Sequence, residues 1–125
     1  MKKYMLLQED TKMLGSAKLF RIRAVTELCN AAGDVIVVNG QLGGYVQAEK
    51  NLSHEGSCWL HDQSICCGKA AITGDAQIYG TSVISGRSSV SGPATVKNSV
   101  IKECAKIIGR TWVEDKHLGG NTVVR

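Results

Sequence analysis

Between residue 54 and about residue 113 the sequence repeats every six residues, and this repeat restricts the possible folds more than any other feature. The clearest units read ITGDAQ, IYGTSV, ISGRSS and VSGPAT. An aliphatic residue opens each unit, and a small residue follows four places later. Two places after the opening position only glycine, aspartate and asparagine occur, at Gly56, Asp62, Gly68, Gly74, Gly80, Gly86, Gly92 and Asn98.

These three residue types tolerate a positive φ, so their column predicts a chain corner in every unit. Between corners, alternating side chains point into and out of a short strand. The predicted inward residues are His54, Leu60, Cys66, Ile72, Ile78, Ile84, Val90 and Val96, and then, after the repeat loses one residue, Ile101, Ile107 and Val113. One unit cannot bury its apolar side alone, whereas stacked units bury a continuous column. We therefore predict an all-β fold, a β-helix.

The pattern resembles the hexapeptide-repeat, left-handed β-helix family, in the short I/V-x-G-x-A-x variety carried by bacterial and phage genomes. The resemblance covers about half of the chain. It implies a left-handed parallel β-helix, a triangular solenoid with three hexads per turn and about three to four coils in this sequence. It also implies a homotrimer. The family includes acyltransferases, carbonic-anhydrase-like enzymes and proteins with no known chemistry, so the resemblance is less specific for activity.

Residues 1–48 lack the repeat, and we expect them to form a small N-terminal β cap. Strands are predicted at residues 3–7, 19–25 and 35–38. A cap is needed because the end of a solenoid exposes unpaired strand edges and an open core. Residues 49–125 form the β-helix, ending in a tail that either closes the far end or reaches a neighbouring subunit.

Composition excludes several classes of function. No apolar run approaches the roughly 20 residues of a membrane span, and no signal-peptide stretch follows the start, so we expect a cytoplasmic protein, bacterial or phage-encoded. The five cysteines are an odd number, which favours free thiols. Neither CxxC nor HxxxH spacing occurs, so we predict no metal site and no cofactor. The net charge of +4 includes no basic run, which argues against duplex nucleic acid but leaves a small anionic ligand open.

Outward side chains about 18 residues apart should stack into three faces. The first face shows no feature that suggests an interface or a ligand site. The third face carries an apolar stripe of Ile65, Val83 and Val100, which we interpret as the interface of the homotrimer. Alternatively, outward β-branched residues simply favour strands. At the corner that leaves this face, Lys69 and Arg87 either bind an anion or are ordinary solvated charges.

The second face carries aromatic and polar residues together: Trp59, His61, Gln77, Tyr79, Thr95, Lys97 and Trp112. Flat rings beside hydrogen-bond donors suit a nucleobase, while Lys or Arg holds phosphate. The predicted ligand-binding residues are therefore Trp59, His61, Gln77, Tyr79, Lys97, Lys69 and Arg87. Packing of this face against the cap or another subunit is the alternative.

Three functions remain open. The first is a non-enzymatic homotrimer that binds a small anionic, nucleotide-like ligand between subunits, as a phage protein that sequesters a host signalling nucleotide would. The second is an acyltransferase with His61 as general base. The sequence offers no loop excursion from the coil, no acceptor-binding domain and no carboxylate placed to orient His61. The third is a purely structural solenoid.

Overall fold

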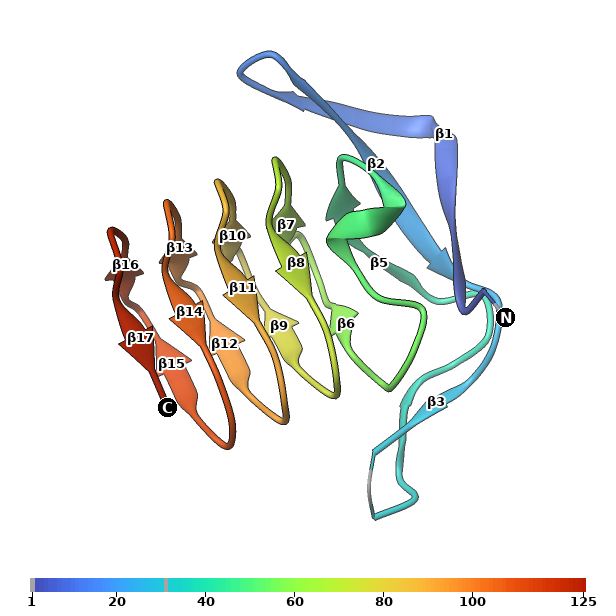
Figure 1. Cartoon of the computed structure of the whole chain (residues 1–125). Coiled ribbons are helices and arrows are strands. Elements are labelled where there is room, and N and C mark those ends of the chain that lie inside the picture. The colour runs from blue at the N-terminus through green and yellow to red at the C-terminus, as the bar shows by residue number, and fades with distance from the viewer. Residues whose placement is uncertain (1, 31) are drawn as a thin grey trace.

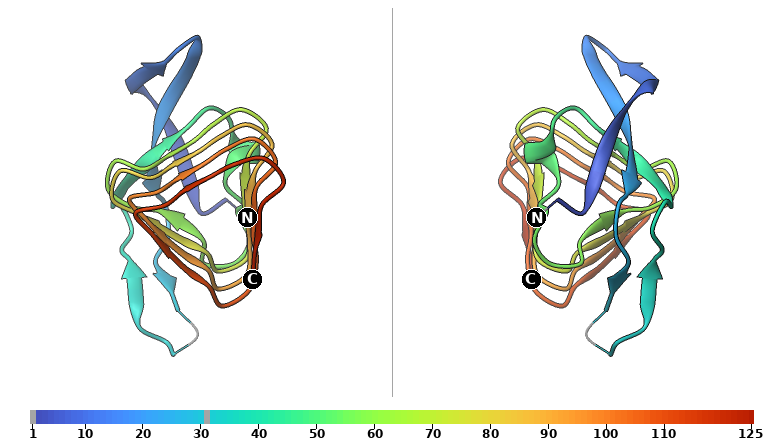
Figure 2. Two further views of the ribbon diagram at one scale, coloured as in Figure 1. Left: turned by 90° about the vertical axis from the view of Figure 1, so that its left-hand side faces the viewer. Right: turned by 90° about the vertical axis from the view of Figure 1, so that its right-hand side faces the viewer.

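The computed structural model describes residues 2–30 and 32–125, and it is built almost entirely of short strands (Figure 1). From residue 42 onward the chain winds into a solenoid of about five turns, which confirms the predicted β-helix. The turns superpose as a triangle in the views along the coil (Figure 2). The left-handed winding remains a prediction from the resemblance.

Three parallel sheets form the sides of the triangle. The third face is formed by β5 (Leu42–Val46), β7 (Ile65–Cys66), β10 (Val83–Ile84), β13 (Val100–Ile101) and β16 (His117–Leu118). The first face contains β8 (Ala71–Ile72), β11 (Ser89–Val90), β14 (Lys106–Ile107) and β17 (Val123–Val124). The second face contains β6 (Trp59–Leu60), β9 (Gln77–Tyr79), β12 (Thr95–Lys97) and β15 (Trp112–Glu114).

The number of turns exceeds the predicted three to four because both ends of the sequence contribute strands. β5 was assigned to the cap, but it pairs in parallel with β7 and so belongs to the first coil. The tail contributes β16 and β17, which continue the stack. The cap and the solenoid therefore share one sheet.

The rest of the cap consists of two hairpins. β1 (Tyr4–Leu14) and β2 (Ala17–Ala24) pair antiparallel, and β2 also pairs with β5. β3 (Leu28–Cys29) and β4 (Val35–Val37) form a separate hairpin. A short 3-10 helix, η1 (Glu49–Asn51), follows β5 within the first coil. The two hairpins project beyond different sides of the triangle (Figure 2).

The predicted corners and core are confirmed. All eight residues of the corner column have φ between 47° and 71°. The inward side chains from Leu60 to Ile107 are fully buried, and Val113 is 3% exposed. Glycine is required sterically as well as conformationally at Gly86, since a Cβ there would lie 2.8 Å from the backbone nitrogen of Glu103 in the next coil.

His54 is an exception, because the prediction that it points into the core is wrong. Leu52 takes the inward position instead; it is fully buried and bridges to Ile72. The His54 ring stacks on Tyr4 with centroids 4.1 Å apart, and its Nδ1 accepts the backbone N–H of Lys3. The buried Lys3 ammonium also donates to the carbonyl of Cys58 at 2.7 Å. This end of the coil is therefore closed by residues from the start of the chain.

The cap also covers side chains that the repeat directs outward. Ile65 is 8% and Cys67 is 6% exposed, because both pack with Leu19 and Tyr45. The expectation that Ile65 belongs to an open apolar stripe is therefore wrong, and the stripe that remains uncovered is shorter. All five cysteines are free thiols, as predicted.

Neither a membrane-spanning helix nor a metal-binding group of side chains is present among the described residues. Residues 2–30 and 32–125 contain no helix long and apolar enough to cross a membrane. Within the same ranges, no group of three or more His, Cys, Asp or Glu side chains is arranged to hold a metal ion.

We expect Ile78→Asp to prevent the coils from folding. A buried aliphatic side chain contributes about 1.5 to 3 kcal/mol, and an unpaired buried carboxylate costs more than that. Ser89→Asp, which changes the outward residue of β11, should alter the free energy of unfolding by less than about 1 kcal/mol. Urea denaturation followed by circular dichroism measures both. Equal losses of stability would show that the inward and outward assignments are wrong.

Candidate functional site

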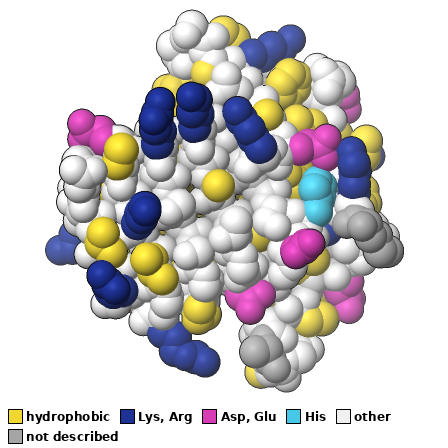
Figure 3. Space-filling model, viewed as in Figure 1, with side chains coloured by type: hydrophobic (Ala, Val, Ile, Leu, Met, Phe, Trp, Pro, Cys, Tyr) yellow, Lys and Arg dark blue, Asp and Glu magenta, His cyan; other side chains and the backbone are white. Residues whose placement is uncertain are grey.

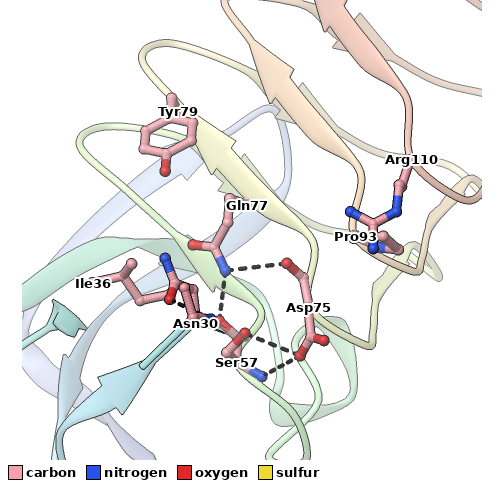
Figure 4. A pocket seen from close by; sticks show the side chains of 9 residues that line it. Asn30, Ile36, Ser57, Asp75, Gln77, Tyr79, Pro93 and Arg110 are labelled. Carbon is pink, nitrogen blue, oxygen red and sulfur yellow. Dashed lines mark hydrogen bonds between the residues drawn. The ribbon is translucent and has the colours of Figure 1, made fainter. Parts of the chain in front are cut away.

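A groove of about 400 Å³ lies between the β3–β4 hairpin and the solenoid (Figure 4). The hairpin contributes one wall, with Asn30, Ala32 and Ile36. The other wall comes from the second face and from the corner that precedes it, with Ser57, Asp75, Gln77, Tyr79, Pro93 and Arg110. Of the predicted ligand-binding residues, only Gln77 and Tyr79 line this groove.

The hairpin stands against the second face because it packs with the same core as Trp59. Leu28 and Val37 belong to the buried cluster that contains Trp59, and Tyr4 meets the indole edge-on with centroids 6.2 Å apart. Trp59 is fully buried. The prediction that its ring is open for a ligand to stack on is therefore wrong, and the alternative of packing against the cap is correct for this residue. Its Nε1 is buried and has no hydrogen-bond partner among the described residues.

His61, Gln77 and Tyr79 form a tight group beside the groove. The His61 and Tyr79 rings are stacked, with centroids 4.3 Å apart and planes 10° from parallel. His61 Nε2 lies 2.6 Å from Gln77 Oε1, and Gln77 Nε2 donates to the carbonyls of Ser57 and Asp75. Because the Gln77 amide nitrogen is the donor, its oxygen must accept, so His61 Nε2 carries the hydrogen. The Gln77 side chain therefore links the His61 ring by hydrogen bonds to the backbone of Ser57 and Asp75.

The environment of His61 keeps the ring neutral. The side chain is 9% exposed, and burial lowers its pKa below the usual 6.5, although the hydrogen bond to Gln77 and the charge of Asp62 oppose that change. Burial also raises the pKa of the Tyr79 phenol, which stays protonated at neutral pH. A neutral imidazole that donates through Nε2 and is covered by Tyr79 is well suited to support that ring.

Two opposite charges face the groove without neutralising each other. Asp75 is fixed by Ser57, whose backbone N–H and Oγ–H both donate to Asp75 Oδ1 at 3.0 Å. Arg110 lies farther along the same corner, on the other side of the opening (Figure 4). Among the described residues, neither side chain has an ion-pair partner within 4.0 Å.

Lys97 and Trp112 extend the site along the second face. Lys97 pairs in register with Tyr79, and its Nζ lies 5.8 Å from the centre of the Trp112 ring. Trp112 is 63% exposed, as its outward position predicts, and its Nε1 donates to Glu114. An open ring and a cation therefore continue beyond the groove.

Lys69 and Arg87 lie elsewhere. They occupy the corner between the third and first faces, where the Lys69 N–H donates to the Gly86 carbonyl and the Arg87 N–H to that of Glu103. In the triangular cross-section this corner is opposite the second face (Figure 2). Figure 3 shows a row of Lys and Arg side chains along the edge of the coils. The structure therefore does not bring these two residues together with Tyr79.

Sequence reasoning missed Asp75 and Arg110 because it considered strand residues and neglected this corner. A usable signal was present, since Ser57, Asp75 and Pro93 follow each other at the spacing of one coil, and Arg110 follows after the lost residue. The hairpin residues Asn30, Ala32 and Ile36 carry no comparable signal.

Comparisons with known proteins do not identify the chain: no protein-family model matches it, and no curated protein matches it at a significant level.

We expect the stabilising contribution of His61 to be lost in acid. Burial lowers its folded-state pKa, so the unfolded chain binds the proton more readily. The contribution is complete above the unfolded pKa of about 6.5 and declines as the pH falls from there toward the folded pKa. Urea denaturation at pH 7.5 and 5.5 should show a smaller advantage of the wild type over His61→Phe at the lower pH. A folded-state pKa above 6.5 in an NMR titration of His61 would contradict this.

Proposed function

We propose that the protein is a non-enzymatic β-helix that binds a small anionic, nucleotide-like ligand in the groove between the β3–β4 hairpin and the second face. One observation carries the proposal: the Tyr79 ring lines the same cavity as the Arg110 guanidinium, which forms no ion pair with any described residue. An aromatic face stacks a base, and a guanidinium binds phosphate in a fork of hydrogen bonds. The site belongs to one chain, whereas the sequence led us to expect it between subunits.

The volume and the surroundings of the groove support this proposal. About 400 Å³ is within the range of small-molecule sites. Lys97 and Trp112 lie along the same face and supply a second cation and a second ring for the rest of a larger ligand. Sequestration of a signalling nucleotide requires a protein that binds the nucleotide without altering it chemically, as proposed here.

The acyltransferase alternative has less support. A general base must reach the substrate with a free lone pair, which in His61 is on Nδ1, because Nε2 donates to Gln77. The ring is only 9% exposed and is stacked on Tyr79. His61 does not line the groove. Its contacts are those of a residue that positions Tyr79.

We expect nucleoside monophosphates to bind, as measured by titration calorimetry with AMP, GMP, CMP and UMP. Tyr79→Ala should weaken binding of the best of the four by about 1 to 3 kcal/mol, the value of one lost base stack. Arg110→Gln should weaken it more at low salt than at high salt, because screening reduces the contribution of the guanidinium.

Arg87→Gln is the matched control, since it removes the same charge from the opposite corner and should leave affinity unchanged. Mass spectrometry of molecules released from the purified protein by denaturation complements the titrations. A chemically altered nucleotide or a transferred acyl group would favour the enzyme. Absence of binding by all four nucleotides, with no released ligand, would favour the purely structural solenoid.

We also propose that the chain forms a homotrimer through the uncovered part of the third face. Because the cap covers Ile65, the stripe left for a neighbour consists of Val83 and Val100, which pair in register and are half-buried. Apolar side chains in adjacent strands on an outer face favour contact with another subunit.

Val83→Lys should convert the trimer into monomers or aggregates, because three ammonium groups would enter one interface. Light scattering at micromolar concentration measures the state of both proteins. Lys106→Ala, on the first face, is the control and should remain trimeric. A monomeric wild-type protein would refute the proposed assembly without affecting the groove, which lies within one chain.

A further inference from the structure

The groove contains one anionic side chain, and its geometry restricts the ligand. Asp75 is the only acidic residue among the described lining residues. Its Oδ1 is occupied by the two donors of Ser57, whereas no hydrogen bond of the described residues involves Oδ2. An ionised carboxylate only accepts hydrogen bonds. Asp75 is exposed, so the Oδ2 oxygen is open to solvent and available to accept a hydrogen bond from a ligand.

The other polar groups of the groove leave mainly donors for a ligand. Asn30 Oδ1 already accepts the backbone N–H groups of Ala32 and Asp34, so the side chain offers its amide hydrogens. The Arg110 guanidinium has donors only. Gln77 is occupied by His61, Ser57 and the Asp75 carbonyl. The groove thus offers the hydrogen-bond donors of Asn30 and Arg110 to an anionic group of the ligand. It offers the Asp75 carboxylate to a part of the ligand that carries N–H groups.

We propose that Asp75 makes the groove selective for guanine among the nucleobases, an inference that rests on the nucleotide-binding function proposed above. The phosphate lies at Arg110, the base lies against Tyr79, and the base edge meets Asp75 Oδ2. Guanine presents N1–H and the N2 amino group side by side, so two donors converge on the carboxylate without a neighbouring acceptor.

Each of the other bases places an acceptor against the carboxylate. Adenine has N1 beside its N6 amino group, and cytosine has N3 beside its N4 amino group. Uracil has one N–H between two carbonyl oxygens. A lone pair that faces a carboxylate is repelled, so these bases bind more weakly.

Titration calorimetry of the wild-type protein tests the proposal with GMP, IMP, AMP and UMP. GMP should bind about tenfold to a hundredfold more tightly than AMP or UMP, the discrimination that a two-donor contact to a base provides. IMP keeps N1–H but lacks the N2 amino group, so its affinity should lie between those of GMP and AMP.

Asp75→Asn is the decisive variant because it is isosteric and still accepts the hydrogen bonds of Ser57. The amide should reduce GMP affinity by about the same tenfold to hundredfold factor. It should not weaken AMP, since the amide Nδ2 that replaces Oδ2 can donate to N1 of adenine. Glu55→Gln is the control for the lost charge, because Glu55 is exposed and does not line the groove.

The outcomes separate this inference from the function on which it rests. Loss of the guanine preference in Asp75→Asn but not in Glu55→Gln supports it. Equal affinity of the wild type for all four nucleotides, or a preference that survives Asp75→Asn, overturns the role of Asp75 and leaves nucleotide binding intact. Failure of all four to bind overturns the proposed function itself.

Discussion

The solenoid depends on corners that adopt positive φ and stack on one another in register. Hydrogen bonds between successive coils run directly through these corners, as between the Lys69 N–H and the Gly86 carbonyl. Little space is left for a side chain there, which is why glycine dominates the column. At three of the four other described residues with positive φ, the side chain accepts a backbone N–H of a neighbouring coil. Asp62 accepts from Gly80, Asn98 from Thr81, and Glu103 from Gly120.

The groove follows from the same stacking. Because corners repeat in register, Ser57, Asp75 and Arg110 are aligned along one edge of the triangle, and the hydrogen bonds of Ser57 fix the Asp75 carboxylate. The β9 backbone presents Gln77 and Tyr79 on the adjoining face, where His61 from the preceding coil supports them. The solenoid makes a rigid wall, and the β3–β4 hairpin converts it into a groove.

The sequence predicts the direction of each side chain in the coils much better than its exposure. Direction is a local property, set by alternation and by the corner residues, and the inward column is confirmed from Leu60 to Val113. Exposure depends on segments distant in sequence. Trp59 points outward but is covered by the cap, where Tyr4 meets its ring edge-on, and Ile65 is covered by its packing with Leu19 and Tyr45. Hexad periodicity contains no information on where a cap docks, so Asn30 and Arg110 could not be placed together beforehand.

The burial of Lys3 has a consequence for the order in which the chain folds. Adjacent coils make contacts across about 18 residues, as between Ser57 and Asp75. The Lys3 ammonium, in contrast, binds a carbonyl 55 residues farther along. Contacts between residues close in sequence form faster, because less chain entropy is lost in closing the loop. We therefore expect β1 to reach its final position after the coil that it closes.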